Sequence, residues 1–282
     1  MSSNLLKSIF ISVYAAYIFA GALTALLALQ RGFDLAWSGA ALAHLPMAVL
    51  FSRLLLLKNL PRSHRWLPTT TALTATGAVI AAYGFFANNS VAGVMGIVAL
   101  VGYLIYLLWY SQFSRSPAGA LQPGRKLPDF SAVDSTGDSF SPADLAGRPA
   151  VLLFFRGNWC PLCMAQVREI AASYRQLAER DIEVVLISSQ SPEKTARLAR
   201  RFDAPMRFVV DRNNAIARQL GIAWQHALPF GMQLLGYRSE SVLPTAIVID
   251  SAGRIVLADQ TDNYRIRPEP ATFIAALEES VG

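Results

Sequence analysis

The chain has 282 residues, enough for two domains, and 53% of them are hydrophobic whereas 16% are charged. Its net charge of +6 does not indicate nucleic-acid binding, because the Lys and Arg residues are scattered or flank apolar segments. The two cysteines are too few for a disulfide framework, and they fit a reducing or an oxidising compartment equally well.

Most of the hydrophobic residues lie in four apolar segments within residues 1–113, and each segment has about the 20 residues needed to cross a bilayer as a helix. The segments are rich in Ala and Gly, as expected where helices pack closely inside a membrane. We therefore predict an all-α transmembrane four-helix bundle over residues 1–113. The four segments cover residues 9–29, 35–57, 67–86 and 91–113.

Positive charges in the loops predict the orientation of this bundle. The first loop has only Arg31 against Asp34, and the third has no charge. By the positive-inside rule, the N-terminus and the C-terminal domain face the cytoplasm, and the protein is a multi-pass protein of the cell (inner) membrane. The basic residues assigned to the cytoplasmic side are Lys7, Lys58, Arg62, Arg65, Arg115, Arg125 and Lys126.

His44 is the only histidine within the apolar segments, and it lies two residues before Pro46. A polar group at membrane depth is often functional, but a histidine that packs in a proline-kinked helix is the competing interpretation. No segment contains a cysteine, so these helices cannot relay electrons by thiol exchange. They form either an anchor or a site for a lipid-soluble partner.

Residues 114–126 are basic and rich in Pro, Gly and Ser, which predicts a linker at the membrane surface. Residues 127–282 then alternate strand and helix patterns, so we predict an α/β domain with a mixed central sheet and helices on both faces. The expected strands cover residues 130–133, 139–140, 150–155, 182–188, 207–210, 246–249 and 255–258. The expected helices cover residues 164–177, 192–202, 214–220 and 270–279.

Cys160 and Cys163 lie where the strand over residues 150–155 meets the following helix. Pro161 suits the first helical turn, and the positive end of the helix dipole favours a thiolate on Cys160. We therefore expect Cys160 to attack a disulfide and Cys163 to resolve the mixed disulfide. The alternative is half of a zinc site, but this needs about four ligands and only His226 is a realistic addition. A redox dithiol with no metal and no other cofactor is the prediction.

Several motifs in order carry a family resemblance. They are residues 127–130 (LPDF), the turn at Gly137, residues 144–149 (DLAGRP), residues 155–163 (FRGNWCPLC) and residues 243–250 (LPTAIVID). With these motifs, residues 127–282 resemble the alkyl hydroperoxide reductase / thiol-specific antioxidant (peroxiredoxin-like) branch of the thioredoxin superfamily. The resemblance implies a thioredoxin-like fold.

The resemblance also implies that Pro244 is a cis-proline packed against the dithiol, with Trp159 helping to shape the substrate groove. The backbone of Leu243 would then offer hydrogen bonds to a substrate peptide. The alternative is an ordinary trans proline at a strand edge.

Two departures from related families concern the mechanism. Peroxidases of the family carry a Pro-x-x-x-Thr-x-x-Cys motif, but counting back from Cys160 gives Leu153 and Gly157. Arg156 is either a replacement anion-stabilising group or a surface arginine at a strand end. Thioredoxins keep a buried acid six residues before the first cysteine, where this chain has Phe154.

Residues 221–242 form an apolar, aromatic stretch that includes Trp224, His226 and Phe230. This stretch is either a rim on which a partner protein docks or a loop that packs on its own core or on the bilayer. His226 is a further candidate proton donor.

The predicted function is a membrane-anchored thiol-disulfide oxidoreductase, and the first alternative is a thiol peroxidase with antioxidant activity. The second alternative is a redox-sensing protein that binds or assembles a membrane partner. The expected partners are a protein disulfide or dithiol, or a small peroxide, together with the lipid bilayer.

Overall fold

The computed structural model describes residues 3–57 and 64–281, so the predicted cytoplasmic residues Lys58 and Arg62 lie outside the described residues. The chain divides into two compact units. The helix unit comprises Met1–Phe113 and Pro229–Tyr237, and the redox unit comprises Ser114–Leu228 and Arg238–Gly282.

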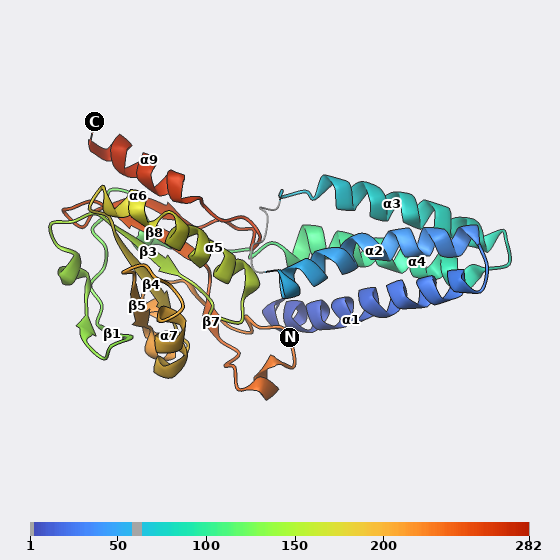
Figure 1. Cartoon of the computed structure of the whole chain (residues 1–282), viewed down its shortest axis with the longest axis horizontal. Coiled ribbons are helices and arrows are strands. Elements are labelled where there is room, and N and C mark those ends of the chain that lie inside the picture. The colour runs from blue at the N-terminus through green and yellow to red at the C-terminus, as the bar shows by residue number, and fades with distance from the viewer. Residues whose placement is uncertain (1–2, 58–63, 282) are drawn as a thin grey trace. The chain divides into compact units, whose positions relative to one another are not determined.

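In the helix unit, α1, α2, α3 and α4 run alongside one another (Figure 1). Asp34 starts α2, because its carboxylate accepts the Trp37 N–H at 2.9 Å. A π-helical turn, Tyr106–Tyr110, continues α4. The bounds are Ser3–Gln30 for α1, Leu35–Leu56 for α2, Pro68–Ala82 for α3 and Ser90–Ile105 for α4.

Of the four predicted spans, three are matched by helices long and apolar enough to cross a membrane, namely Ser3–Gln30, Leu35–Leu56 and Ser90–Tyr110. The third segment differs, because α3 has 15 residues. A helix of that length measures about 22 Å, against about 30 Å for a hydrocarbon core. It begins at Pro68 and tightens into a 3₁₀ turn at Tyr83–Phe85.

Glycines bring α2 and α3 into backbone contact. A Cβ at Gly39 would clash with the backbone of Ala81, and one at Gly77 would clash with the backbone of Ala43. His44 is fully buried, with Nδ1 2.8 Å from the Ala40 carbonyl oxygen, and its ring fills the space that a side chain at Gly21 would need. This places His44 in the packing between α1 and α2.

The redox unit is built on one mixed sheet with the strand order β2-β1-β5-β4-β3-β8-β9. β3 pairs in parallel with β4, and β4 with β5, whereas the other pairs are antiparallel. Every residue of β3 is buried, so both faces of this strand are covered. The strands are β1 (Ala132–Asp134), β2 (Ser139–Phe140), β3 (Ala150–Phe154), β4 (Glu183–Ser188), β5 (Arg207–Val210), β8 (Thr245–Ile249) and β9 (Ile255–Asp259).

The helices around this sheet follow the predicted order (Figure 1). The predicted dithiol helix is broken at Ser173 into α5 and α6. Val167 and Ile170 of α5 pack with Phe273 of the last helix in one apolar core that also contains both cysteines. The helices are α5 (Pro161–Ala172), α6 (Tyr174–Ala178), α7 (Pro192–Ala199), α8 (Ala215–Gln219) and α9 (Pro270–Val281).

The segment predicted as a linker, residues 114–126, packs on the redox unit instead. Leu121 is fully buried, and the Gly124 N–H donates to the Ile255 carbonyl at 2.7 Å. The Ala118 N–H donates to the Gln260 side chain, also at 2.7 Å. The basic composition rich in Pro, Gly and Ser predicted a linker at the membrane surface, but backbone hydrogen bonds and a buried leucine hold this segment against the sheet.

Candidate redox site

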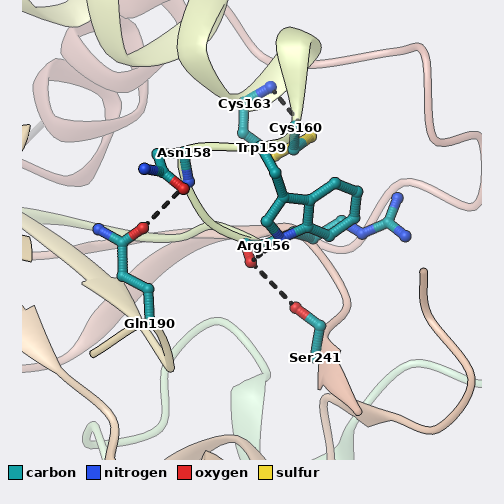
Figure 2. Close-up of a disulfide and its surroundings, with 7 residues drawn as sticks. All are labelled: Arg156, Asn158, Trp159, Cys160, Cys163, Gln190 and Ser241. Atoms are coloured by element: carbon teal, nitrogen blue, oxygen red, sulfur yellow. Dashed lines mark hydrogen bonds between the residues drawn. A yellow bond between two sulfur atoms is a disulfide. The ribbon is translucent and has the colours of Figure 1, made fainter. Parts of the chain in front are cut away.

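Cys160 and Cys163 form a disulfide across the first turn of α5, with their Cα atoms 5.3 Å apart (Figure 2). Cys160 is the N-cap, and its sulfur accepts the Cys163 N–H at 3.3 Å. Pro161 is the first helical residue, as predicted from its fixed φ and missing N–H. Both sulfur-bearing residues are buried at the edge of the main core.

The turn between β3 and α5 depends on Gly157, whose φ of +128° is unfavourable for other residues. A Cβ there would also lie 3.1 Å from the Trp159 indole. The Cys160 N–H donates to the Gly157 carbonyl at 3.2 Å, and the Asn158 N–H donates to Oε1 of Gln190 at 3.0 Å (Figure 2). The turn that leads to the disulfide is therefore fixed by a hydrogen bond within its own backbone and by Gln190, which follows β4.

Arg156 is buried beside this turn, between two indole rings. Its guanidinium carbon lies 4.8 Å from the ring centroid of Trp159 and 5.3 Å from that of Trp224, within the range of cation–π attraction. With 8% of its surface exposed, Arg156 is not the surface arginine that one interpretation of the sequence allowed. The site thus contains a positive charge held close to the dithiol turn.

The backbone of Arg156 is fixed as well. Its carbonyl accepts the Trp159 indole N–H at 3.1 Å and the Ser241 hydroxyl at 3.2 Å (Figure 2). Ser241 belongs to β7 (Ser241–Val242), which pairs with β6 (Ala223–Trp224) so that Ser241 lies opposite Trp224. The same hairpin base therefore holds Arg156 through both its backbone and its side chain.

The prediction of a cis-proline at Pro244 is wrong, because no peptide bond among the described residues is cis. The β3–β8 register pairs Phe154 with Thr245. Pro244, the residue before Thr245, therefore lies beside the start of the dithiol turn. The trans form is the lower-energy one for an X-Pro bond, and here the neighbouring groups are satisfied locally. The Thr245 hydroxyl donates to the Leu243 carbonyl at 2.8 Å.

The backbone of Leu243 does not offer the predicted hydrogen bonds to a substrate peptide. Its N–H donates to the Ile222 carbonyl at 2.7 Å, and its carbonyl accepts the Thr245 hydroxyl. The N–H is occupied because residue 243 extends the β6–β7 hairpin, and the carbonyl already accepts a local side-chain hydroxyl.

Another arginine, Arg115, lies at the start of β8. The guanidinium of Arg115 lies 3.3 Å from the Pro244 carbonyl and 3.4 Å from the Thr245 hydroxyl oxygen, and both contacts are polar. Burial, and after it the positive charge of Arg156, lowers the pKa of Arg267 to about 9, while Asp259 opposes the shift. Charged arginines at these positions give the site a positive potential that favours a thiolate or an anionic group.

The side chains that peroxidases use next to the attacking cysteine are absent from this turn. Leu153 is a buried residue of β3, and Gly157 has no side chain. Phe154 occupies the place of the thioredoxin acid and is buried. His226 adopts a left-handed backbone conformation in the loop after β6. Within residues 3–57 and 64–281, no group of three or more His, Cys, Asp or Glu residues could hold a metal ion.

The sequence interpretation missed several residues of the site. Trp224 belongs to the aromatic stretch of residues 221–242, but nothing in that pattern predicted that its ring would lie against Arg156. Ser241, Gln190 and Arg115 carry no motif, and they reach the site from three distant parts of the chain.

A profile of the AhpC/TSA family matches residues 123–258. A candidate peroxiredoxin of Mycobacterium tuberculosis is 30% identical over 141 residues, which cover 49% of this chain and 84% of that protein. The chain belongs to the AhpC/TSA family. This membership concerns its second half and confirms the resemblance to the redoxin branch of the thioredoxin superfamily.

The chain is also similar to a thiol-disulfide oxidoreductase and to a peroxidoxin of known structure. The thiol-disulfide oxidoreductase ResA of Bacillus cereus is 22% identical over 157 residues, or 55% of this chain and 77% of ResA. The crystal structure of peroxidoxin BcpB from Mycobacterium tuberculosis covers 56% of this chain and 97% of its own, with 23% identity and a TM-score of 0.47. The chain is therefore an oxidoreductase that acts on thiols or peroxides.

Proposed function

We propose that the protein is a membrane-anchored thiol-disulfide oxidoreductase. The observation that carries this proposal is the Cys160–Cys163 disulfide across the first turn of α5. A vicinal pair of this kind stores two electrons without another cofactor, and the helix N-terminus stabilises the thiolate form of Cys160. The partner is a protein that presents a disulfide or a dithiol.

The reaction proceeds by two exchanges. In the reduced protein, the Cys160 thiolate attacks one sulfur of the substrate disulfide, which forms a mixed disulfide and releases one substrate thiolate. The Cys163 thiolate then attacks the Cys160 sulfur, so the Cys160–Cys163 bond forms and the second substrate sulfur leaves. Two electrons pass to the substrate, and an external dithiol restores the reduced pair by the reverse exchanges.

Groups around the pair support these steps. Arg156 places a positive charge beside the turn, which favours thiolate over thiol. Trp159 is half-buried and covers Arg156, so its exposed surface is available to a docking partner. Pro244, whose peptide bond is trans, precedes β8 beside the dithiol turn. Its carbonyl oxygen lies 3.3 Å from the Arg115 guanidinium.

A peroxidase is the second candidate, favoured by the buried Arg156 and by the peroxiredoxin relative. In that reaction Cys160 would take an oxygen atom from a peroxide to form a sulfenic acid, and Cys163 would condense with it and release water. The turn lacks a hydroxyl group at position 157 to orient the peroxide, which is why disulfide exchange comes first in the proposal.

The membrane anchor is supported by three helices of spanning length and by the exposure of their large apolar side chains. We extend the proposal to a multi-pass protein with the redox unit in the cytoplasm, on the basis of the loop charges. The test is a reporter enzyme that works only outside the cytoplasm, fused after residue 282. If this reporter is active, the redox unit faces the other side of the membrane and the proposed orientation is wrong.

A trapping experiment on the full chain in detergent micelles tests the chemistry. With a disulfide substrate, the Cys163→Ser variant should accumulate a mixed disulfide at Cys160, whereas Cys160→Ser should form none. In parallel, the wild-type oxidation rate with hydrogen peroxide is followed by tryptophan fluorescence. A peroxide rate far above that of a free thiolate, without trapping by disulfides, would replace the oxidoreductase by the peroxidase.

A further inference from the structure

The loop that joins β6 to β7 carries an exposed apolar tip. This hairpin tip, Pro229–Tyr237, contains no charged residue. The 3₁₀ turn within it, Met232–Leu235, has no buried residue. Phe230, Leu234 and Leu235 expose 62%, 91% and 71% of their surfaces. Such a cluster is unfavourable in water and marks a contact surface.

Among the described residues, the redox unit exposes only one side chain of this kind. Among the described residues, the large apolar side chains that are strongly exposed lie in the helix unit, to which the tip belongs, with Val133 as the exception. The tip therefore shares the surface character of the helices rather than that of the sheet domain from which it extends.

Hydrogen bonds hold the tip at a defined level of α1. The Phe230 N–H donates to the Ser8 carbonyl at 3.0 Å, and the Ser12 hydroxyl donates to the Phe230 carbonyl at 3.0 Å. Ser8 and Ser12 are one helical turn apart, so the tip lies against this single turn.

That turn carries the features of a membrane–water interface. Phe10, between the two serines, contacts Trp109 and Tyr110 at centroid distances of 5.8 and 6.0 Å. The Lys7 ammonium lies 5.5 Å from the Trp109 ring centroid. Trp and Tyr gather at the headgroup level of a membrane. Lys7 itself is buried, and its ammonium donates to the Gln112 carbonyl.

We propose that the hairpin tip inserts into the bilayer interface beside α1 and is an additional membrane contact of this protein. The inference rests on the proposed membrane anchor. Lipid is the occupant because the tip is uncharged, highly exposed and fixed to the aromatic level of a helix that can cross a membrane. Its base carries Trp224 and Ser241, so a tip held in lipid steadies the residues that position Arg156.

Site-specific fluorescence quenching in liposomes tests the insertion. In the full chain with both native cysteines changed to Ser, a single cysteine at Leu234 or Leu235 is labelled with an environment-sensitive dye. Ser251→Cys, on an exposed turn of the redox unit, is the water-facing control. Val98→Cys, on the exposed surface of α4, is the control for the membrane anchor.

Lipids with a nitroxide near the headgroup should quench the dye at Leu234 and Leu235 by about twofold, and aqueous iodide should quench it far less than at Ser251. The proposal is overturned if iodide quenches both tip positions as strongly as Ser251 while Val98 remains protected. If Val98 is also open to iodide, the membrane anchor itself fails, so the two failures are distinguishable.

Discussion

The two units of this protein differ in how many large apolar residues they expose. The helix unit buries alanines such as Ala25, Ala40 and Ala81 completely, and it exposes Leu56 and Phe86 by 79% and 88%. In the redox unit, large apolar residues fill the interior, and every residue of β3 is buried.

This difference fits the proposed membrane anchor. In water, burial of large apolar side chains drives folding, so they lie inside. In lipid that driving force is absent between helices, and close backbone packing through small residues replaces it. The contacts of Gly39 and Gly77 are of this second kind.

The largest expected effect comes from filling a glycine contact. Gly77→Val should destabilise the helix unit by about 3 kcal/mol, because its side chain meets the Ala43 backbone rather than a movable side chain. Thermal unfolding in micelles measures this. Val79→Leu on the same helix is the control, since Val79 is 73% exposed and should tolerate the change. Equal effects of the two variants would contradict the packing described here.

A charge on each surface tests the contrast in solvent directly. Val101→Lys, on the exposed side of α4, should weaken membrane integration by about 2.5–3 kcal/mol. Val133→Lys, on the exposed side of β1, should change stability by less than about 0.5 kcal/mol. Extraction from membranes and thermal unfolding are the measurements. If Lys at position 101 were as harmless as at 133, the helix unit would face water.

The third prediction concerns the clamp on Arg156. Trp224→Leu removes one of its two indole rings, which costs about 1 kcal/mol and should slow disulfide exchange by up to about tenfold. The loss should be larger with a negatively charged aromatic disulfide than with a neutral one, because the guanidinium supplies charge. Trp224→Phe should recover part of the rate. Equal losses with both substrates would indicate a purely structural role.

The smallest effect is an acid-dependent one at the surface of the redox unit. The hydrogen bond from Arg218 holds the pKa of Glu240 below its usual range. A carboxyl group with a lower pKa in the folded state stabilises the fold above its unfolded pKa, and this contribution is lost as the pH falls through the folded value. Glu240→Gln should therefore lose up to about 1 kcal/mol at pH 7, and this loss should disappear at an acid pH below the lowered pKa of Glu240. Unfolding at both pH values checks this, and a loss that persists in acid would contradict the ion-pair explanation.

Local chemistry in the sequence was enough to predict the centre of the site. An apolar run before the cysteines, apolar residues at helical spacing after them, and Pro161 predicted a strand followed by a helix, and the structure has β3 and α5 there. These features depend on neighbouring residues and on backbone preferences, which a sequence shows directly. The length of the apolar segments likewise predicted helices long enough to cross a membrane, as α1 and α2 are.

Other features depended on residues that are distant in the chain. Trp224 and Ser241 reach Arg156 through the β6–β7 pairing, Leu121 is buried on the redox unit, and Phe230 bonds to α1. Arg115, distant in the chain, contacts the Pro244 carbonyl. Sequence alone determined most of the strands and helices and the place of the dithiol turn, because those choices are local. Only the tertiary structure decided which side chains surround the turn, because long-range contacts follow from sheet register and packing.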